Sequence, residues 1–139
     1  MDSQSLASTL RAWARGSYPT EAGTELLIRS GRASYEGAPW VTKHGDHAAI
    51  DLEPLLAHTA AWSGGEQRLI RIAASLLGGE PANLAEDIPG FDRHSTALVL
   101  AAIAHAAGYH EDATVTTNNA GQPTGFTPAG SLFPWPEES

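Results

Sequence analysis

The sequence predicts an all-α single domain of about five helices, followed by an irregular C-terminal arm. Apolar residues recur at helical spacing in several segments, and glycine or proline follows most of these segments. After Tyr109 the composition changes to a stretch with four of the nine prolines and little periodicity. We therefore divide the chain into a helical domain, residues 1–109, and an extended Pro- and Gly-rich arm, residues 110–139, packed on the domain or on a partner.

The first two helices are indicated by apolar stripes with recognisable ends. One covers residues 5–15, and Gly16 stands just beyond its end. The other opens at Pro19, a residue suited to the first helical turn, and Gly31 closes it. Gly23 weakens this second helix because glycine has a low helix propensity.

The segment from residue 32 to residue 50 gives a poor signal and leaves two alternatives. Glycine and proline interrupt its short apolar pieces, so a short hairpin turning at His44-Gly45-Asp46 is possible. A one-turn helix starting at Pro39 fits equally well. Asp51 then has the character of an N-cap for a helix that reaches about Ala60.

Two strongly apolar helices, residues 64–77 and 93–107, are expected at the centre of the core. The first carries apolar residues over more than half of its circumference. The second is apolar almost all the way round, so neighbouring elements are expected to surround it.

The connection between these helices mixes apolar and acidic residues. Leu84, Ile88 and Phe91 are expected to tuck under the helices. Glu86 and Asp87 are expected to face water.

Charge and composition exclude several classes of function. The net charge is -8 and the eight basic residues form no cluster, which argues against nucleic acid and membrane as partners. Cysteine is absent, so thiolate chemistry and disulfides are excluded. The amino terminus lacks the pattern of a secretory peptide, and the longest apolar run, about thirteen residues, is shorter than a bilayer crossing needs. We expect a cytoplasmic protein with no cofactor.

The segment from residue 63 to residue 87 begins Ser-Gly-Gly-Glu-Gln and continues into an apolar helix, a Gly-Glu-Pro break and an acidic pair. It resembles the signature segment of ABC-type ATPases, which implies amides placed near a phosphate. The chain has no Walker A pattern, however, because it contains no Gly-Lys pair. We interpret the segment as a helix start in which Ser63 and Glu66 form a capping box. A residual hypothesis is that Ser63, Gly64 and Gly65 bind an anion without hydrolysing it.

A broader resemblance rests on the stretches TELLIRSGR, SGGEQRLIRIAASL and GFDRHSTALVLAAIAHAAG. In these the chain is similar to a group of small helical proteins of actinobacterial type whose activity is undefined. The resemblance implies a fold and no particular activity.

Two groups of polar residues are candidates for metal chemistry. His44, Asp46 and His47, close to Asp51, offer imidazole and carboxylate ligands of the kind that zinc prefers. They are the basis of an alternative function as a metal-dependent hydrolase.

A second group, at the end of the last predicted helix, contains His105, His110, Glu111 and Asp112. We assign it a structural role, because a protonated histidine complements the dipole at a helix C-terminus. No catalytic residue is assigned, and an anion- or small-molecule-binding domain is a further alternative.

The aromatic residues of the arm give the favoured hypothesis. Phe126, Phe133 and Trp135 are separated by proline and glycine, and aromatic side chains dominate interface energetics. For the arm itself we prefer packing on its own domain, and the alternative is that these residues bind a protein partner or a second copy. We expect a protein that acts through protein contacts without catalysis, by self-association or with another protein.

Overall fold

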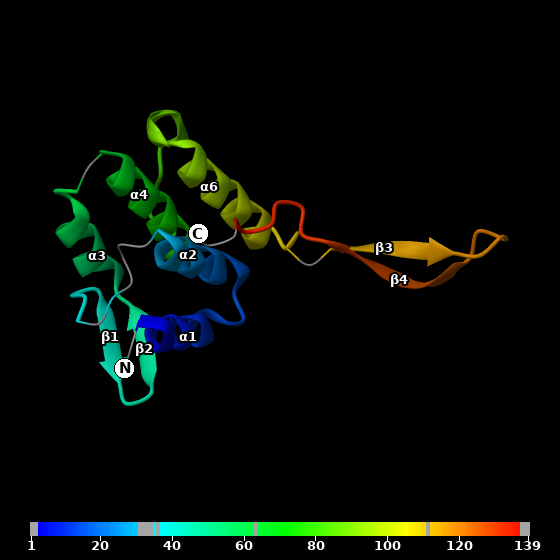
Figure 1. Ribbon diagram of the computed structural model, residues 1–139, viewed down its shortest axis with the longest axis horizontal. Helices are drawn as coiled ribbons and strands as arrows, with labels where there is room; N and C mark the ends of the chain where they lie inside the picture. The colour runs from blue at the N-terminus through cyan, green and yellow to red at the C-terminus, as the bar shows by residue number, and fades with distance from the viewer. Residues whose placement is uncertain (1–2, 31–34, 36, 63, 111, 137–139) are drawn as a thin grey trace.

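The computed structural model describes residues 3–30, 35, 37–62, 64–110 and 112–136. In chain order, these residues form α1 (Ser3–Ala14), α2 (Tyr18–Arg29), β1 (Val41–His44), β2 (His47–Ile50), α3 (Leu52–Thr59), α4 (Gly64–Gly78), α5 (Leu84–Asp87), the 3-10 turn η1 (Ile88–Gly90), α6 (Arg93–Ala106), β3 (Asp112–Thr117) and β4 (Pro123–Gly130). Figure 1 shows a body that contains all the helices and a hairpin that projects from it.

The predicted all-α class is wrong, because the described residues also form two antiparallel two-stranded sheets. The first, β1 with β2, decides between the two alternatives left open for this segment in favour of the hairpin. His44 pairs with His47, so Gly45 and Asp46 form a two-residue loop. Gly45 has a φ of 60°, which suits glycine at the first central position of a tight hairpin turn.

The second sheet corrects the prediction of an irregular arm. Strands β3 and β4 pair from Asp112↔Gly130 to Thr117↔Pro123, with two register irregularities. The Asn118 side chain accepts from the amides of Ala120 and Gln122 and so fixes the turn. Because such local hydrogen bonds leave no helical or strand period in the sequence, the turn was not recognised.

The helix at the centre of the body is α2. It packs against both α4 and α6 far more extensively than these two pack against each other. A side-chain carbon on Gly23 would lie 2.7 Å from Cγ of Leu77 and 3.0 Å from the carbonyl oxygen of Ala73. Gly23 therefore allows α2 and α4 to approach closely, and the helices predicted to form the centre instead flank α2.

Two expectations about burial in the second half of the chain are wrong. Leu100 and Ile103 of α6 are 41% and 51% exposed, so no described element covers that face of the helix. Asp87, expected in water, is 1% exposed, whereas Leu84 and Ile88 are exposed. Asp87 is buried because Arg71 donates two hydrogen bonds to its Oδ1 atom, at 3.0 and 2.7 Å.

Candidate functional site

A cluster of polar side chains lies at the C-terminal end of α6, where the hairpin leaves the body. Among the described residues, Glu21, His105 and His110 are the only group of three potential metal ligands whose donor atoms all lie within 4.8 Å of one another. They come from the first turn of α2, the last turn of α6 and the turn that follows α6.

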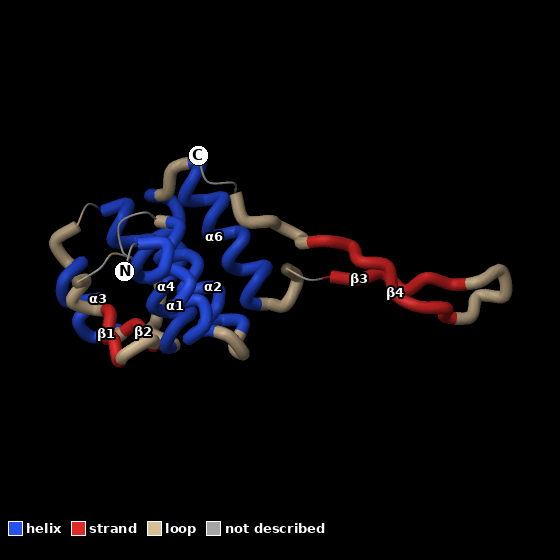
Figure 2. The backbone as a smooth tube through the Cα atoms, turned by 60° about the horizontal axis from the view of Figure 1, so that its bottom comes forward, coloured by secondary structure: helices blue, strands red, loops and turns tan. Residues whose placement is uncertain are grey.

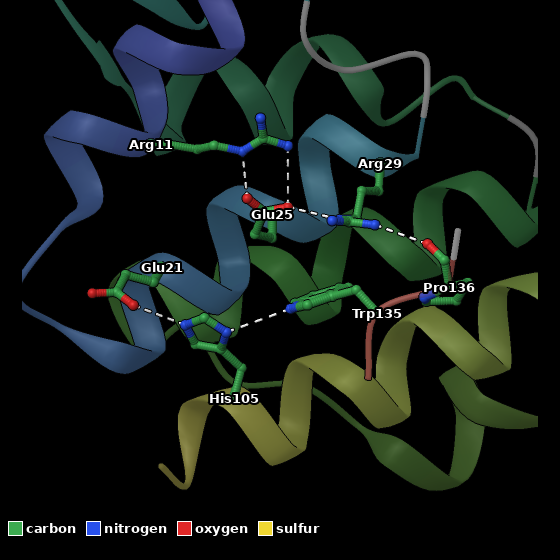
Figure 3. Close-up of polar contacts among 7 residues, drawn as sticks. All are labelled: Arg11, Glu21, Glu25, Arg29, His105, Trp135 and Pro136. Carbon is green, nitrogen blue, oxygen red and sulfur yellow. Dashed lines mark hydrogen bonds and ion pairs between the residues drawn. The ribbon is translucent and has the colours of Figure 1, made fainter. Parts of the chain in front are cut away.

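The start of α2 positions Glu21. The Ser17 side chain caps the helix by accepting from the amide of Thr20. Oε2 of Glu21 accepts from the backbone amide of Gly16 at 3.0 Å. Oε1 lies 2.8 Å from Nε2 of His105, a contact that Figure 3 shows. Two contacts from different parts of the chain therefore fix both oxygens of this carboxylate.

The end of α6 positions the two histidines. Gly108 has a φ of 91°, its amide bonds to the His105 carbonyl at 3.0 Å, and the amide of Tyr109 bonds to the Ala104 carbonyl at 2.8 Å. These two bonds form a Schellman ending, which reverses the chain. The reversal stacks the His110 ring on the His105 ring, with centroids 3.8 Å apart and planes inclined by 6°.

Hydrogen bonds at both ring nitrogens define the tautomer of neutral His105. Nε1 of Trp135 donates to Nδ1 of His105 at 3.4 Å, so the proton of neutral His105 lies on Nε2, from which it is donated to Glu21. Burial by itself raises the pKa of Glu21, but the hydrogen bonds from His105 and Gly16, together with the electrostatic effect of His105 and His110, outweigh burial and lower it. Glu21 is therefore held as a carboxylate.

The chain after β4 returns to the body and closes one side of the cluster. The indole of Trp135 packs against the core, and the guanidinium of Arg29 lies 5.2 Å from its ring centroid. Nη1 of Arg29 also donates to the carbonyl oxygen of Pro136 at 2.9 Å, as Figure 3 shows. These contacts hold the segment around Trp135 on its own body.

Glu25 organises the arginines beside this segment. Its carboxylate accepts from Arg11 on α1 and from Arg29 on α2. Burial raises the pKa of Glu25, yet the hydrogen bonds and charges of the two arginines outweigh burial and lower it. The ion-pair network thus links α1, α2 and the C-terminal segment.

A pocket of about 380 Å³ adjoins the cluster. Its lining combines two arginines, two glutamates, two histidines and a tyrosine with one alanine: Arg11, Ala14, Arg15, Tyr18, Glu21, Glu25, His105 and His110. The arginines and glutamates balance in formal charge. The pocket therefore offers polar groups of both signs to a small ligand or to an ion with bound water.

Comparison with protein-family models, with curated proteins and with solved structures gave no match to this chain. None of the helices in the described part of the chain has the length and apolar content that a bilayer crossing requires.

The structure does not gather the ligand atoms of the metal group predicted at the first hairpin. His44, Asp46 and His47 are exposed, and they belong to no group of three donors among the described residues. The histidines face each other across the ladder only as the pair that flanks the turn. The metal prediction at this hairpin has no geometric support.

The predicted anion site lies only partly within the described residues. Ser63, and with it the predicted capping box, lies outside the described residues. Gly64 and Gly65 begin α4 and are exposed. Gly65 borders a second pocket, of about 350 Å³, whose lining includes Glu66 and Asp92. The same lining also contains His94, so the anion site stays a prediction.

The three aromatic residues predicted to bind a partner have different environments. Trp135 is anchored on its own body, whereas Phe126 is 76% exposed on β4 and Phe133 is 46% exposed. The end of the arm around Trp135 therefore packs on its own body, whereas Phe126 on the hairpin stays exposed.

Sequence reasoning missed Glu21 as a site residue. It lies 84 residues before His105, and no local pattern connects the two. His105 and His110 were grouped, but with Glu111, which lies outside the described residues, and with Asp112, which begins β3. The Gly108 signal for a Schellman ending could have indicated that the two rings come together.

Proposed function

We propose that the protein acts through protein contacts and that its partner is a second copy of the same chain. The observation that carries the proposal is the hairpin of β3 and β4, which projects from the body in both views (Figures 1 and 2). A two-stranded hairpin that packs on nothing is marginally stable in water. It also presents unpaired strand edges, which a partner can cover.

A backbone hydrogen bond closes the base of the hairpin, and the chain beyond it is anchored on the body. The amide of Leu132 bonds to the carbonyl of Tyr109 at 2.9 Å, so the chain leaves and re-enters at one point. Trp135 then fixes the returning chain on His105 and Arg29. An eight-residue strand such as β4 is roughly 26 Å long, enough to reach across a small domain.

The arm and the outer face of α6 have the composition of an interface. Between Arg93 and Glu137 the only charged residues are Glu111 and Asp112, in a chain with 17% charged residues overall. Charged residues are depleted and aromatic residues enriched at the centre of protein interfaces. Phe126 on the arm and Leu100 and Ile103 on α6 supply the exposed apolar surface.

A second copy is the occupant we favour, because each chain carries both surfaces. In a two-fold dimer the arm of each chain would lie on the α6 face of the other, and both contacts would form at once. Both surfaces are nearly free of charge, so the acidic residues of the two bodies do not oppose each other in the contact. The arm and the α6 face together approach the roughly 20–30 residues that each side of a stable interface contributes.

The test is the molar mass of the full-length protein, measured by light scattering over a range of concentrations. We expect a monomer–dimer equilibrium that Phe126→Ser and Ile103→Ser each weaken by at least about 2 kcal/mol, the loss typical of a central interface residue. Trp13→Ser is the matched control, because Trp13 is 40% exposed on α1 and lies outside the proposed surface. A wild-type chain that stays monomeric at every concentration would refute the proposal.

A further inference from the structure

We propose that Glu21, His105 and His110 form a binding site for one divalent transition-metal ion, with zinc as the expected occupant. Two imidazoles and one carboxylate are a donor set that zinc and neighbouring late first-row metals prefer. The three donors come from separate elements, and they meet beside a pocket that can admit an ion with bound water. The site lies on the body of one chain, so it does not depend on the proposed contact between copies.

An unsatisfied atom supports the proposal. Nδ1 of His110 is buried, yet it has no hydrogen-bond partner among the described residues. A buried polar atom without a partner costs about 1–3 kcal/mol, and a missing ion or water is a common reason for one. A metal ion bound at Nδ1 of His110 would give this atom a partner.

The stacked rings define the movement that binding requires. The lone pair of an imidazole nitrogen lies in the ring plane, and the planes of His105 and His110 are almost parallel. One ion cannot lie in both planes, so one ring must turn out of the stack. We expect His110 to turn, because both ring nitrogens of His105 are held by Glu21 and Trp135. Leaving the stack also disturbs the edge contact of His110 with the Tyr18 ring, whose centroid lies 4.6 Å away.

The Trp135 contact gives the site a spectroscopic signature. In the structure, Nδ1 of His105 accepts from the Trp135 indole while Nε2 contacts Glu21. A metal bound at Nε2 moves the proton of neutral His105 to Nδ1, which then donates and can no longer accept from the indole. Metal binding therefore breaks the hydrogen bond of Trp135.

The test is a zinc titration of the tag-free, metal-stripped full-length protein by calorimetry, with cobalt absorption as a second reading. We expect one equivalent to bind, and Glu21→Gln and His110→Gln each to weaken the affinity at least about tenfold. The matched control is the double variant His44→Gln/His47→Gln, which removes two exposed histidines outside the site. This control should bind as the wild type does.

Circular dichroism of the metal-free variants shows whether they fold. If His110→Gln does not fold, the test stands on Glu21→Gln, which keeps the shape of the side chain and removes its charge. The indole proton resonance of Trp135, assigned with Trp135→Phe, should shift when zinc saturates the protein.

Three results of the titration would overturn the site: no saturable binding, affinity unchanged in Glu21→Gln and His110→Gln, or loss of binding in the control. An unmoved Trp135 resonance at saturation would also overturn it.

Discussion

Replacing Trp135 by alanine tests whether the C-terminal segment stabilises its own body. Removing a half-buried indole forfeits about half of the 1.5–3 kcal/mol that full burial of a large apolar side chain contributes. The stacking of Arg29 on the ring adds about 0.5–1 kcal/mol, and the long hydrogen bond to His105 adds about 0.5 kcal/mol. We expect Trp135→Ala to lower the free energy of unfolding by about 2–3 kcal/mol.

The assay is thermal unfolding followed by circular dichroism, at a concentration where the chain is monomeric. For a domain of this size the expected loss corresponds to a decrease in Tm of roughly 8–12 °C. Phe126→Ala is the comparison, because its side chain is 76% exposed and its removal should change stability by no more than about 0.5 kcal/mol. Equal shifts in Tm for the two variants would refute the cis anchoring of Trp135.

Three further substitutions test the packing and the charges of the body. Glu25 has a lowered pKa in the folded state, so it contributes stability above pH 4.5 that is lost as the pH falls through the folded pKa; urea unfolding of Glu25→Gln should show a weaker dependence on pH in that acid range. Gly23→Ala should destabilise by up to about 2 kcal/mol in denaturant unfolding, since overpacking of about 1–3 kcal/mol against Leu77 and the Ala73 carbonyl offsets the gain of about 1 kcal/mol in helix propensity; a raised denaturation midpoint would contradict this. Arg71→Met should lower the free energy of unfolding by about 3–5 kcal/mol, because it leaves the Asp87 carboxylate buried without its partner. Adding Asp87→Leu should recover much of this loss in thermal unfolding. If the double variant is no more stable than Arg71→Met, the loss does not come from the unpaired carboxylate.

The sequence predicted the helices better than the sheets because helix signals are local. Caps and periodic apolar residues located α1, α2, α3, α4 and α6 to within a few residues. The two hairpins depend on turns, and only the one at Gly45 contains a dipeptide that suggests a tight turn. The turn around Asn118 is built from side-chain bonds across five residues, a pattern that composition alone describes as irregular.

The errors in burial and in the site have a common cause, which is pairing between distant residues. Asp87 is buried because Arg71, sixteen residues earlier, reaches it. Glu21 meets His105 only because α2 packs along α6. Helical periodicity describes which face of a helix is apolar, but it carries no information about which charged residue a neighbouring element will supply.

The hydrogen bond from the amide of Leu132 to the carbonyl of Tyr109 brings the two ends of the hairpin together where it joins the body. The entropy cost of closing a loop rises only slowly with its length. We therefore expect that a short turn or an unrelated sequence in place of residues 112–130 would change the stability of the body little. The same junction is a suitable place to graft a binding peptide or a fluorescent label, since the Trp135 anchor beyond it would be retained. The protein can thus be treated as a scaffold with one exchangeable appendage.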